Sequence, residues 1–405
     1  MKDKVTNKTV LVAMTGGLES TVAAYLLKKQ GFRCIGIGIQ LFEPNEEKGA
    51  LADVAISDLN KVKSICTYLD IPFYAVNAAE VFADKVLDPV VGSILSGHTF
   101  EPLVFLNLVV MDVLLEKALK FNTSLIASGH YAKVLKNQKT GAFELMVAND
   151  IEHDQSYFLS RLEQKHLSNL MLPLSEIRKQ EVEKIGELMK VDYLSRPKSK
   201  IQHIMHDPRN QNLVEARSSK DLRRIGTIYD YRSESSISEH LGIHRYYIGQ
   251  KNLPFRPESP IDPLKEVVSI VPFKGNIFID YPDRLQYSHA LVSRFIPASH
   301  LDTTQPISAY VKMSSNAQKI PCRIFFKNNQ NCLIDFEDRR PGILITGQFF
   351  AFYNRKSEKG KIIGTAIVEM GGFFENGDFL TLPIYKRNSE EEVVKKDGNS
   401  EKLHF

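Results

Sequence analysis

The chain of 405 residues has little cysteine, little net charge and no long apolar run. Cys34 and Cys66 lie in apolar patterns typical of buried free thiols, and Cys322 and Cys332 flank a hairpin-like stretch. No pair has CxxC spacing, so the pattern predicts neither a zinc centre nor a disulfide framework. No apolar run approaches the roughly 20 residues of a membrane span, and the N-terminus has no secretion signal. We therefore expect an intracellular, cytoplasmic protein with no membrane part.

Composition is typical of a globular protein, with 43% apolar and 25% charged residues. The length predicts two or three domains. Net charge is only +4, but the stretch from Arg196 to Arg256 holds 12 Lys and Arg against 6 Asp and Glu, an excess of +6. A local basic surface of this kind suits binding to a phosphate backbone, although solvated basic faces are also common.

Apolar runs alternate with amphipathic helical patterns over residues 1–200. The strand-like runs lie at 9–14, 34–39, 71–78 and 124–128, and the helical patterns at 21–30, from Asp58, and at 103–121. Strands that alternate with helices predict a parallel sheet covered on both faces. We therefore expect a doubly wound α/β domain over 1–200.

The pattern changes after Pro197. Residues 201–264 are polar and basic with helix-like patches, which predicts a small helical basic segment. Residues 265–385 contain short alternating runs separated by turns, which predict a C-terminal antiparallel β-barrel. Residues 386–405 are charged and poor in large apolar side chains, as in a flexible tail.

A glycine-containing turn, TGGLES at 15–20, joins the first strand to the first helix. Gly16 and Gly17 let the backbone approach a phosphate, and the helix that follows offers unpaired N–H groups and the positive end of its dipole. The hydroxyl groups of Thr15, Ser20 and Thr21 can donate to phosphate oxygens, and Glu19 can hold Mg²⁺ beside them. The turn differs from the GxxxxGK[ST] loop and has no lysine at the matching place. A tight βα turn that merely needs glycines is the alternative.

TGGLES is similar to the SGGxDS signature of the PP-loop ATP pyrophosphatases. Further segments resemble the bacterial tRNA-uridine 2-thiolases, in that family's order and over nearly the whole chain. They are ASGHYA (127–132), HDQSYFL (153–159), LPLSEIRKQEVEKIGELMKV (172–191), HRYYIGQKN (244–252) and ITGQFFAFY (345–353). The resemblance implies an enzyme that binds ATP, adenylates the wobble uridine of tRNA and replaces its 2-oxygen with sulfur.

The resemblance also implies which residues bind the substrates. For ATP with Mg²⁺ they are Ala13, Met14, Thr15, Gly16, Gly17, Leu18, Glu19, Ser20, Ile39 and Gly129. For tRNA they are Glu101, Pro102, Leu103, His153, Asp154 and Gln155. Thr15 and Glu19 replace Ser and Asp of the signature, and the longer carboxylate would displace a metal by about an ångström.

The family reaction needs two cysteines, one of which carries a persulfide, because a thiolate is the nucleophile that can hold a sulfane sulfur. Here Leu106 stands at the first cysteine position, and His203 stands closest to the second. Ser314 and Ser315 replace an Arg-Tyr pair that grips tRNA. We therefore predict no catalytic cysteine. The spacing of His203 and His206 permits a pair of metal ligands, but it does not predict a metal centre.

Three functions remain open. The chain can adenylate tRNA and receive sulfur from sulfide or from a partner's persulfide. It can instead be an inactive paralogue that binds tRNA or a true thiolase, or a PP-loop ligase that activates a carbonyl outside tRNA. The expected partners are accordingly tRNA, and a sulfur-relay protein or a true thiolase.

Overall fold

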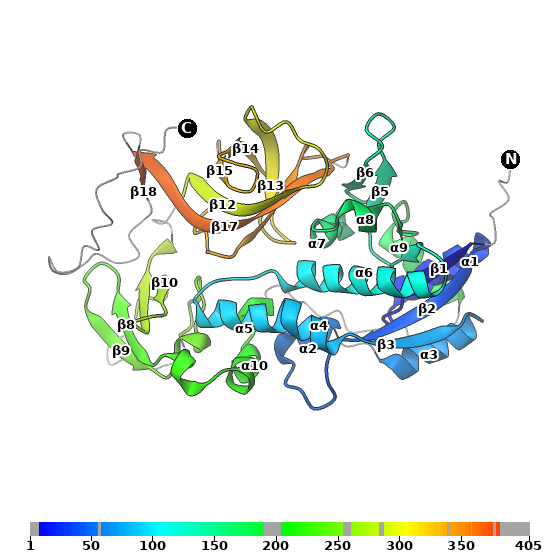
Figure 1. Ribbon diagram of the computed structural model, residues 1–405. Coiled ribbons are helices and arrows are strands. Elements are labelled where there is room, and N and C mark those ends of the chain that lie inside the picture. Colours follow the sequence, from blue (N-terminus) through cyan, green and yellow to red (C-terminus); the bar gives the residue numbers. More distant parts are fainter. Residues whose placement is uncertain are drawn as a thin grey trace.

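The computed structural model describes residues 8–55, 58–189, 204–253, 261–282, 287–337, 341–357, 359–375 and 378–380. These residues form an α/β domain, a central sheet and a barrel. In Figure 1 the α/β sheet lies at the right end, the central sheet at the left end and the barrel above them. No helix in these ranges is both long enough and apolar enough to span a membrane.

The α/β domain contains one parallel sheet with the strand order β3-β2-β1-β4-β7. Its strands are β1 (Thr9–Ala13), β2 (Arg33–Gln40), β3 (Phe73–Asn77), β4 (Ile126–Ala127) and β7 (Leu170–Met171). Strand β1 is buried from its second residue to its last, as a central strand covered on both faces must be. The predicted parallel α/β domain is confirmed.

Alternate residues of β1 face two helical layers. Val10 and Val12 pack in a cluster with α1 (Leu18–Lys29) and α3 (Leu59–Tyr68). Leu11 and Ala13 pack on the other face with the long helix α6 (Pro102–Lys120) and with α5 (Asp88–Leu95). This alternation follows from the two-residue period of a strand. Asp58 starts α3 as expected, because its carboxylate accepts a hydrogen bond from the backbone N–H of Lys61 at 3.0 Å.

All four cysteines are buried free thiols. Cys34 and Cys66 lie in the cluster with α1 and α3, and burial raises the pKa of each to about 11. Cys322 and Cys332 lie in the core of the barrel, where burial raises the pKa of Cys332 to about 12 and that of Cys322 further. Thiols in such surroundings are protonated at neutral pH.

The central part differs from the expected helical segment. It holds α10 (Asn210–Arg217) and a four-stranded sheet with the order β10-β11-β8-β9. The strands are β8 (Gly226–Asp230), β9 (Ser236–His240), β10 (Glu266–Val271) and β11 (Asn276–Asp280). The sequence assigned β10 and β11 to the barrel, but β11 pairs with β8. An alternating run has the same pattern in any half-buried sheet, so the pattern alone could not choose the partner strand.

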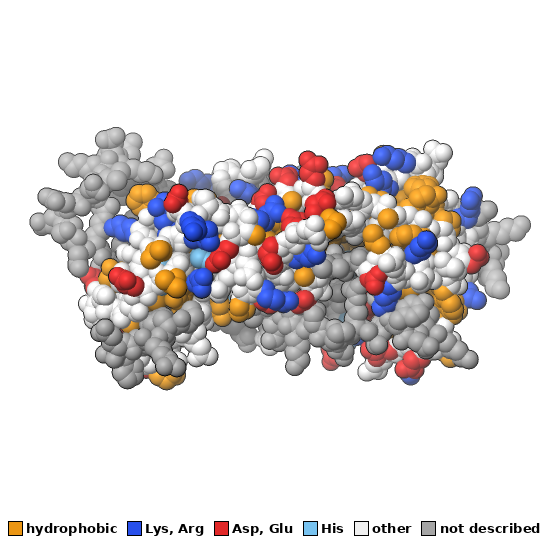
Figure 2. Space-filling model, turned by 90° about the horizontal axis from the view of Figure 1, so that it is seen from below, with side chains coloured by type: hydrophobic (Ala, Val, Ile, Leu, Met, Phe, Trp, Pro, Cys, Tyr) orange, Lys and Arg blue, Asp and Glu red, His pale blue; other side chains and the backbone are white. Residues whose placement is uncertain are grey.

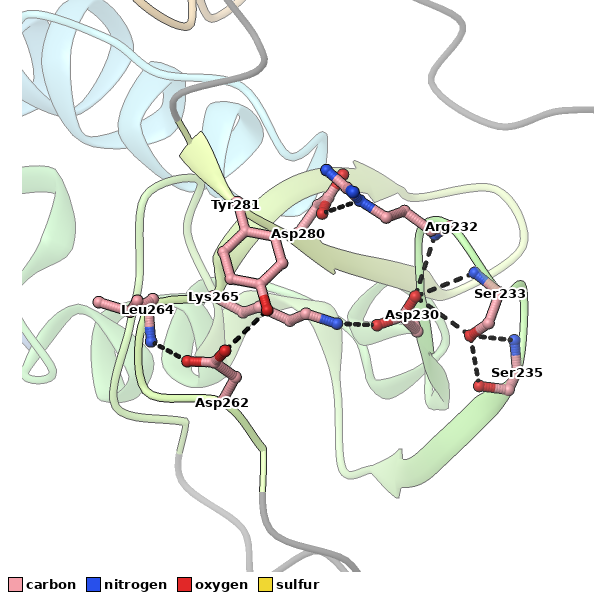
Figure 3. A network of polar contacts seen from close by, with 9 residues as sticks. All are labelled: Asp230, Arg232, Ser233, Ser235, Asp262, Leu264, Lys265, Asp280 and Tyr281. Atoms are coloured by element: carbon pink, nitrogen blue, oxygen red, sulfur yellow. Dashed lines mark hydrogen bonds and ion pairs between the residues drawn. The ribbon is translucent and has the colours of Figure 1, made fainter.

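Charged side chains cross-link one end of this central sheet (Figure 3). Lys265 forms an ion pair with Asp230, and Arg232 Nε donates to Asp280 Oδ1 at 2.8 Å. Both cations lie over the ring of Tyr281, at 5.3 Å for Lys265 and 5.4 Å for Arg232. The network joins the segment before β10 to the ends of β8 and β11.

The C-terminal part is the predicted antiparallel barrel. Its strands are β12 (His289–Pro297), β13 (Ile307–Lys312), β14 (Ile320–Phe326), β15 (Cys332–Asp335), β16 (Phe349–Tyr353) and β17 (Ile362–Glu375). The barrel is closed because β12 pairs with both β15 and β17. Strand β18 (Asp378–Leu380) adds to β17 outside the ring. The tail predicted at 386–405 lies outside the described residues.

Polar contacts join the three parts. Ser156 Oγ lies 3.1 Å from the Tyr353 hydroxyl of the barrel. Arg209 bridges to Asp53 at 2.7 Å, so it ties the start of α10 to the α/β domain. Arg217, at the end of α10, pairs with Glu46 and with Asp88, the latter at 2.7 Å. Part of the basic excess of the central segment is thus neutralised by acids of the α/β domain. On the face seen in Figure 2, basic and acidic side chains are accordingly interspersed.

Replacing Asp230 tests the cross-linked end of the central sheet. Burial would raise the pKa of Asp230, but hydrogen bonds from Lys265, Ser233 and Arg232 outweigh it and lower the pKa to about 2. The carboxylate therefore stabilises the fold above pH 4, and this stabilisation is lost as the pH falls from about 4 to about 2. We expect Asp230→Asn to destabilise the sheet by about 1–3 kcal/mol at pH 7, because Lys265 loses its partner.

Hydrogen exchange of the β8 and β9 amides measures this loss locally. The difference between the variant and the wild type should shrink as the pH falls below 4. Asp221→Asn is the matched control, because Asp221 is exposed. It should change neither the stability of the sheet nor the exchange of the β8 and β9 amides. A difference that stays constant down to pH 2.5 would contradict the proposed role of the Asp230 carboxylate.

Candidate functional site

The loop between β1 and α1 has the geometry of an anion-binding turn. Gly16 has a φ of +76°, in the left-handed region, and Gly17 caps α1 with no side-chain hydrogen bond. Ser20 Oγ and Thr21 Oγ1 donate to the Gly17 carbonyl at 3.1 and 2.8 Å. These two hydroxyl groups, expected to donate to a phosphate, are used inside the loop. The first N–H groups of α1 have no partner within the helix, so they can donate to an anion bound at the loop.

A second segment, Ser128 to His130, lies directly against the first turn of α1. A Cβ atom on Gly129 would lie 2.6 Å from the Glu19 carbonyl carbon and 2.7 Å from the Ser20 nitrogen. Real Cβ atoms do not approach backbone atoms so closely. Position 129 therefore accepts only glycine while the end of β4 stays packed against α1.

A cavity of about 310 Å³ opens between this contact, the carboxyl ends of the strands and helix α6. This is where parallel α/β sheets bind ligands. One wall is polar and comes from the loops after β1 and β4. The other is apolar and comes from β2, α2 (Ala52–Ala55) and α6. The lining residues are Ala13, Met14, Thr15, Glu19, Ser20, Ile37, Ile39, Leu41, Val54, Ala55, Leu103, Leu106, Asn107, Val110, Met111, Ser128, Gly129, His130, Gln155 and Phe158.

The positions assigned to ATP gather at this cavity. Those that line it are Ala13, Met14, Thr15, Glu19, Ser20, Ile39 and Gly129. Gly16, Gly17 and Leu18 complete the loop beside it. Residues far apart in the sequence, 13–20, 39 and 129, are brought together because β1, β2 and β4 are neighbours in the sheet.

Among the described residues of the lining, Glu19 and His130 are ionisable, and none is Lys or Arg. His130 Nδ1 lies 3.0 Å from Ser128 Oγ. Burial lowers the pKa of His130 to about 4, so the imidazole is neutral at physiological pH. His130 can therefore exchange hydrogen bonds with a ligand in the cavity, but it adds no positive charge there.

The positions assigned to tRNA are more dispersed. Leu103 and Gln155 line the cavity. Gln155 Oε1 accepts from the Tyr131 N–H at 3.0 Å, so it holds the segment 127–132 in place. Asp154 is directed inward, because it accepts from the Ala148 N–H at 2.9 Å and from Ser156 Oγ at 2.7 Å.

The remaining tRNA positions lie at the edges of the site. Pro102 begins α6 and is buried. Glu101 accepts a hydrogen bond from the Tyr157 hydroxyl at 3.2 Å. Burial raises the pKa of the Glu101 carboxyl to about 7. His153 Nδ1 lies 3.1 Å from Asp150, with over a third of its side chain exposed. Part of the His153 side chain is therefore open to a partner.

Known proteins are similar to this chain over most of its length. A family model described as tRNA methyl transferase HUP domain matches residues 8–204. The tRNA-specific 2-thiouridylase MnmA of Geotalea uraniireducens is 32% identical over 356 residues, which cover 86% of this chain and 92% of that protein. This chain belongs to the tRNA-specific 2-thiouridylase family.

Two further relatives have the same extent. The MnmA of Clostridioides difficile is 29% identical over 370 residues, which cover 90% of this chain and 98% of that protein. MnmA 2 of Thermoanaerobacter sp. is 29% identical over 372 residues, with the same two coverages. The similarity therefore includes the central sheet and the barrel, in addition to the glycine-containing loop at 15–20, called the phosphate loop below.

Leu106, which the resemblance places at the first cysteine position, lies on the cavity wall. Leu103 lies one turn earlier on the same face of α6. None of the four cysteines lines the cavity. His203 lies outside the described residues. His206 stacks on Tyr247 with ring centroids 4.0 Å apart, and no cluster of three potential metal ligands occurs among the described residues.

The remaining residues of the apolar wall were not predicted from the sequence. Val110 and Met111 extend the face of α6 that carries Leu103, Leu106 and Asn107. Their spacing of three and four residues is the signal of one helical face, so this part could have been found. Val54 and Ala55 come from a short helix with no such periodicity, and only the fold places them here.

Gly129→Ala tests the contact that defines the polar wall. The added methyl group would collide with the backbone of α1, so we expect ATP binding to weaken at least about ten-fold, with some loss of stability. Gly92→Ala is the matched control, because a Cβ there meets no atom within 4 Å and the residue lies in α5. This control should be neutral or stabilising by up to about 1 kcal/mol. Calorimetric titration with ATP and thermal unfolding check both variants, and unchanged ATP affinity in Gly129→Ala would refute the assignment.

Proposed function

We propose that this chain binds ATP in the cavity and adenylates the C2 oxygen of the wobble uridine of tRNA, for replacement by sulfur. The observation that carries the proposal is that the phosphate loop and Leu103–Leu106 border one cavity. A nucleotide on the loop and a uridine beside α6 would therefore meet within it. Membership of the tRNA-specific 2-thiouridylase family supports the same reaction.

The residues of the cavity have distinct tasks in this reaction. The N–H groups at the start of α1 bind the phosphates, and the apolar side chains of Met14 and Ile39 flank the base. Uridine O2 attacks the α-phosphorus, the bond to pyrophosphate breaks, and the N3 proton is released. Among the cavity residues, Glu19 would hold a magnesium ion together with phosphate oxygens. The ion would neutralise charge on the leaving group.

The sulfur must come from outside the chain. The sequence has no cysteine at position 106 or between residues 190 and 203, and its four thiols have raised pKa values. A protonated, buried thiol neither accepts nor passes on a sulfane sulfur. Hydrosulfide would attack C2; it is either free, or released from a partner's persulfide when a second thiol of that partner attacks the inner sulfur and forms a disulfide. The C2–O bond breaks, AMP leaves, and the S–H proton moves to N3.

Alkylation of the native protein tests this division of labour. Purified chain, tRNA, ATP and sulfide should yield pyrophosphate and 2-thiouridine. Prior treatment with iodoacetamide should leave the rate unchanged, since thiols with pKa values of about 11 are about 10⁻⁴ ionised at pH 7. Loss of activity with labelling of a cysteine would contradict the proposal. Absence of tRNA-dependent pyrophosphate release would reject adenylation itself.

A second function is favoured by Leu103 and Leu106. These side chains make the uridine side of the cavity apolar, and the described residues that line this side include no acid and no nucleophile. An inactive paralogue that binds tRNA, or binds a true thiolase, would have this wall. The two functions separate in a strain that lacks its thiolases. Restoration of 2-thiouridine in tRNA by this chain alone excludes the inactive paralogue.

The tRNA backbone requires exposed cations, and we infer that Lys220 and Arg224 supply them. Both side chains are exposed in the segment between α10 and β8 and have no ion pair among the described residues. Arg209 and Arg217, by contrast, are held by carboxylates of the α/β domain. Exposed Phe273 offers a ring for base stacking on the turn between β10 and β11, and Gly275 of this turn lies against Ile225.

Charge reversal tests this surface. Lys220→Glu combined with Arg224→Glu should weaken tRNA binding about ten-fold or more at 0.1 M salt, and it should flatten the salt dependence by about two phosphate contacts. The matched control reverses Lys63 and Lys184, which are exposed on α3 and on α9 (Lys179–Leu188). Filter binding over a salt series measures both variants. Equal weakening in the two pairs would show only a general loss of charge.

A further inference from the structure

The nucleotide cavity has a charge problem. A triphosphate carries several negative charges, yet the described residues of the lining include the Glu19 carboxylate and a neutral His130, with no Lys or Arg among them. The dipole of α1 and a magnesium ion offset part of this charge. The phosphate loop also lacks the lysine of the GxxxxGK[ST] motif. A cation that reaches the loop from another element would therefore have a defined task.

Lys61 lies against the phosphate loop from a neighbouring helix. A Cβ atom on Gly16 would lie 3.4 Å from Lys61 Cδ and 3.5 Å from Lys61 Cγ, which is ordinary contact distance. The start of α3 is fixed on both sides of this contact. Asp58 caps the helix through the Lys61 N–H at 3.0 Å, and Val62 is fully buried in the core beside it. The stem of Lys61 is thus held on the glycine turn.

We propose that Lys61 is a positioning residue for the β- and γ-phosphates of ATP and for the pyrophosphate that leaves. Its ammonium group stands two bonds beyond Cδ, so it reaches an anion bound on the Gly16–Gly17 turn. Lysine suits this task because it is a compact point charge on a flexible stem. The task resembles that of a P-loop lysine, but the residue comes from α3 in place of the loop. The inference rests on the proposed binding of ATP in the cavity.

The competing explanation is that Lys61 only covers Gly16 with its hydrocarbon stem. The two explanations differ in their dependence on charge. A covering role needs the methylene groups and is indifferent to the ligand. A phosphate-binding role needs the ammonium group and grows with the charge of the ligand.

Titration calorimetry on the full chain separates them, with ATP, inorganic pyrophosphate and adenosine as ligands. Lys61→Gln should weaken the binding of ATP and of pyrophosphate about ten-fold, as expected for one lost charge-assisted hydrogen bond, and leave adenosine unchanged. Lys61→Arg keeps the charge and should stay within about three-fold of the wild type. Lys63→Gln is the matched control, since Lys63 is exposed on the same helix, and it should bind all three ligands as the wild type does.

Two results overturn the proposal. One is wild-type affinity of Lys61→Gln for ATP and pyrophosphate. The other is an equal loss for adenosine and ATP, which would indicate a structural role. Either result leaves ATP binding by the wild type, and with it the proposed function, intact. If Lys61→Gln instead loses phosphate affinity while the wild type releases no pyrophosphate with tRNA, the role of Lys61 stands and the adenylation proposal fails.

Discussion

The contact between Gly129 and the first turn of α1 is the constraint on which the site depends. It joins the ends of β1 and β4 through backbone atoms, with no room for a side chain. Gln155 then fixes the segment of Gly129 by accepting from the Tyr131 N–H, and its neighbour Ser156 contacts Tyr353 of the barrel. The phosphate loop, the DQSYFL segment (154–159) and the barrel are thus connected through these short contacts.

The sequence was sufficient wherever local pattern decides structure. The buried runs of the α/β sheet, the Asp58 cap and the glycine turn each depend on a few neighbouring residues, and each was predicted. Prediction failed where a distant partner decides. Strands β10 and β11 alternate like barrel strands, but they pair with each other, and β11 pairs with β8 of the central sheet. The assignment of Asp154 to tRNA stays a prediction; its carboxylate accepts from the backbone N–H of Ala148, a contact that local sequence does not reveal.

Charge shows the same limit in another form. The excess of Lys and Arg between residues 196 and 256 predicted a basic surface, but the count ignores where the counter-charges lie. Arg209 and Arg217 meet Asp53 and Asp88, which belong to a different part of the chain. Their role is to fasten α10 to the α/β domain. The charges left for a polyanion are therefore fewer than the composition indicates, and they are defined by the fold.

The two walls of the cavity respond differently to substitution. The polar wall comes from the loops at the ends of β1 and β4, where Gly129 leaves no room for a side chain and a substitution moves the backbone. The apolar wall includes side chains on one face of α6, where Leu106 fills a position without altering the helix. A chain can therefore lose a thiol at position 106 and keep the geometry of the phosphate loop. A substitution on one wall can therefore leave the other unchanged. For this reason the geometry of the polar wall supports nucleotide binding alone, and the sulfur chemistry depends on the residues of the other wall.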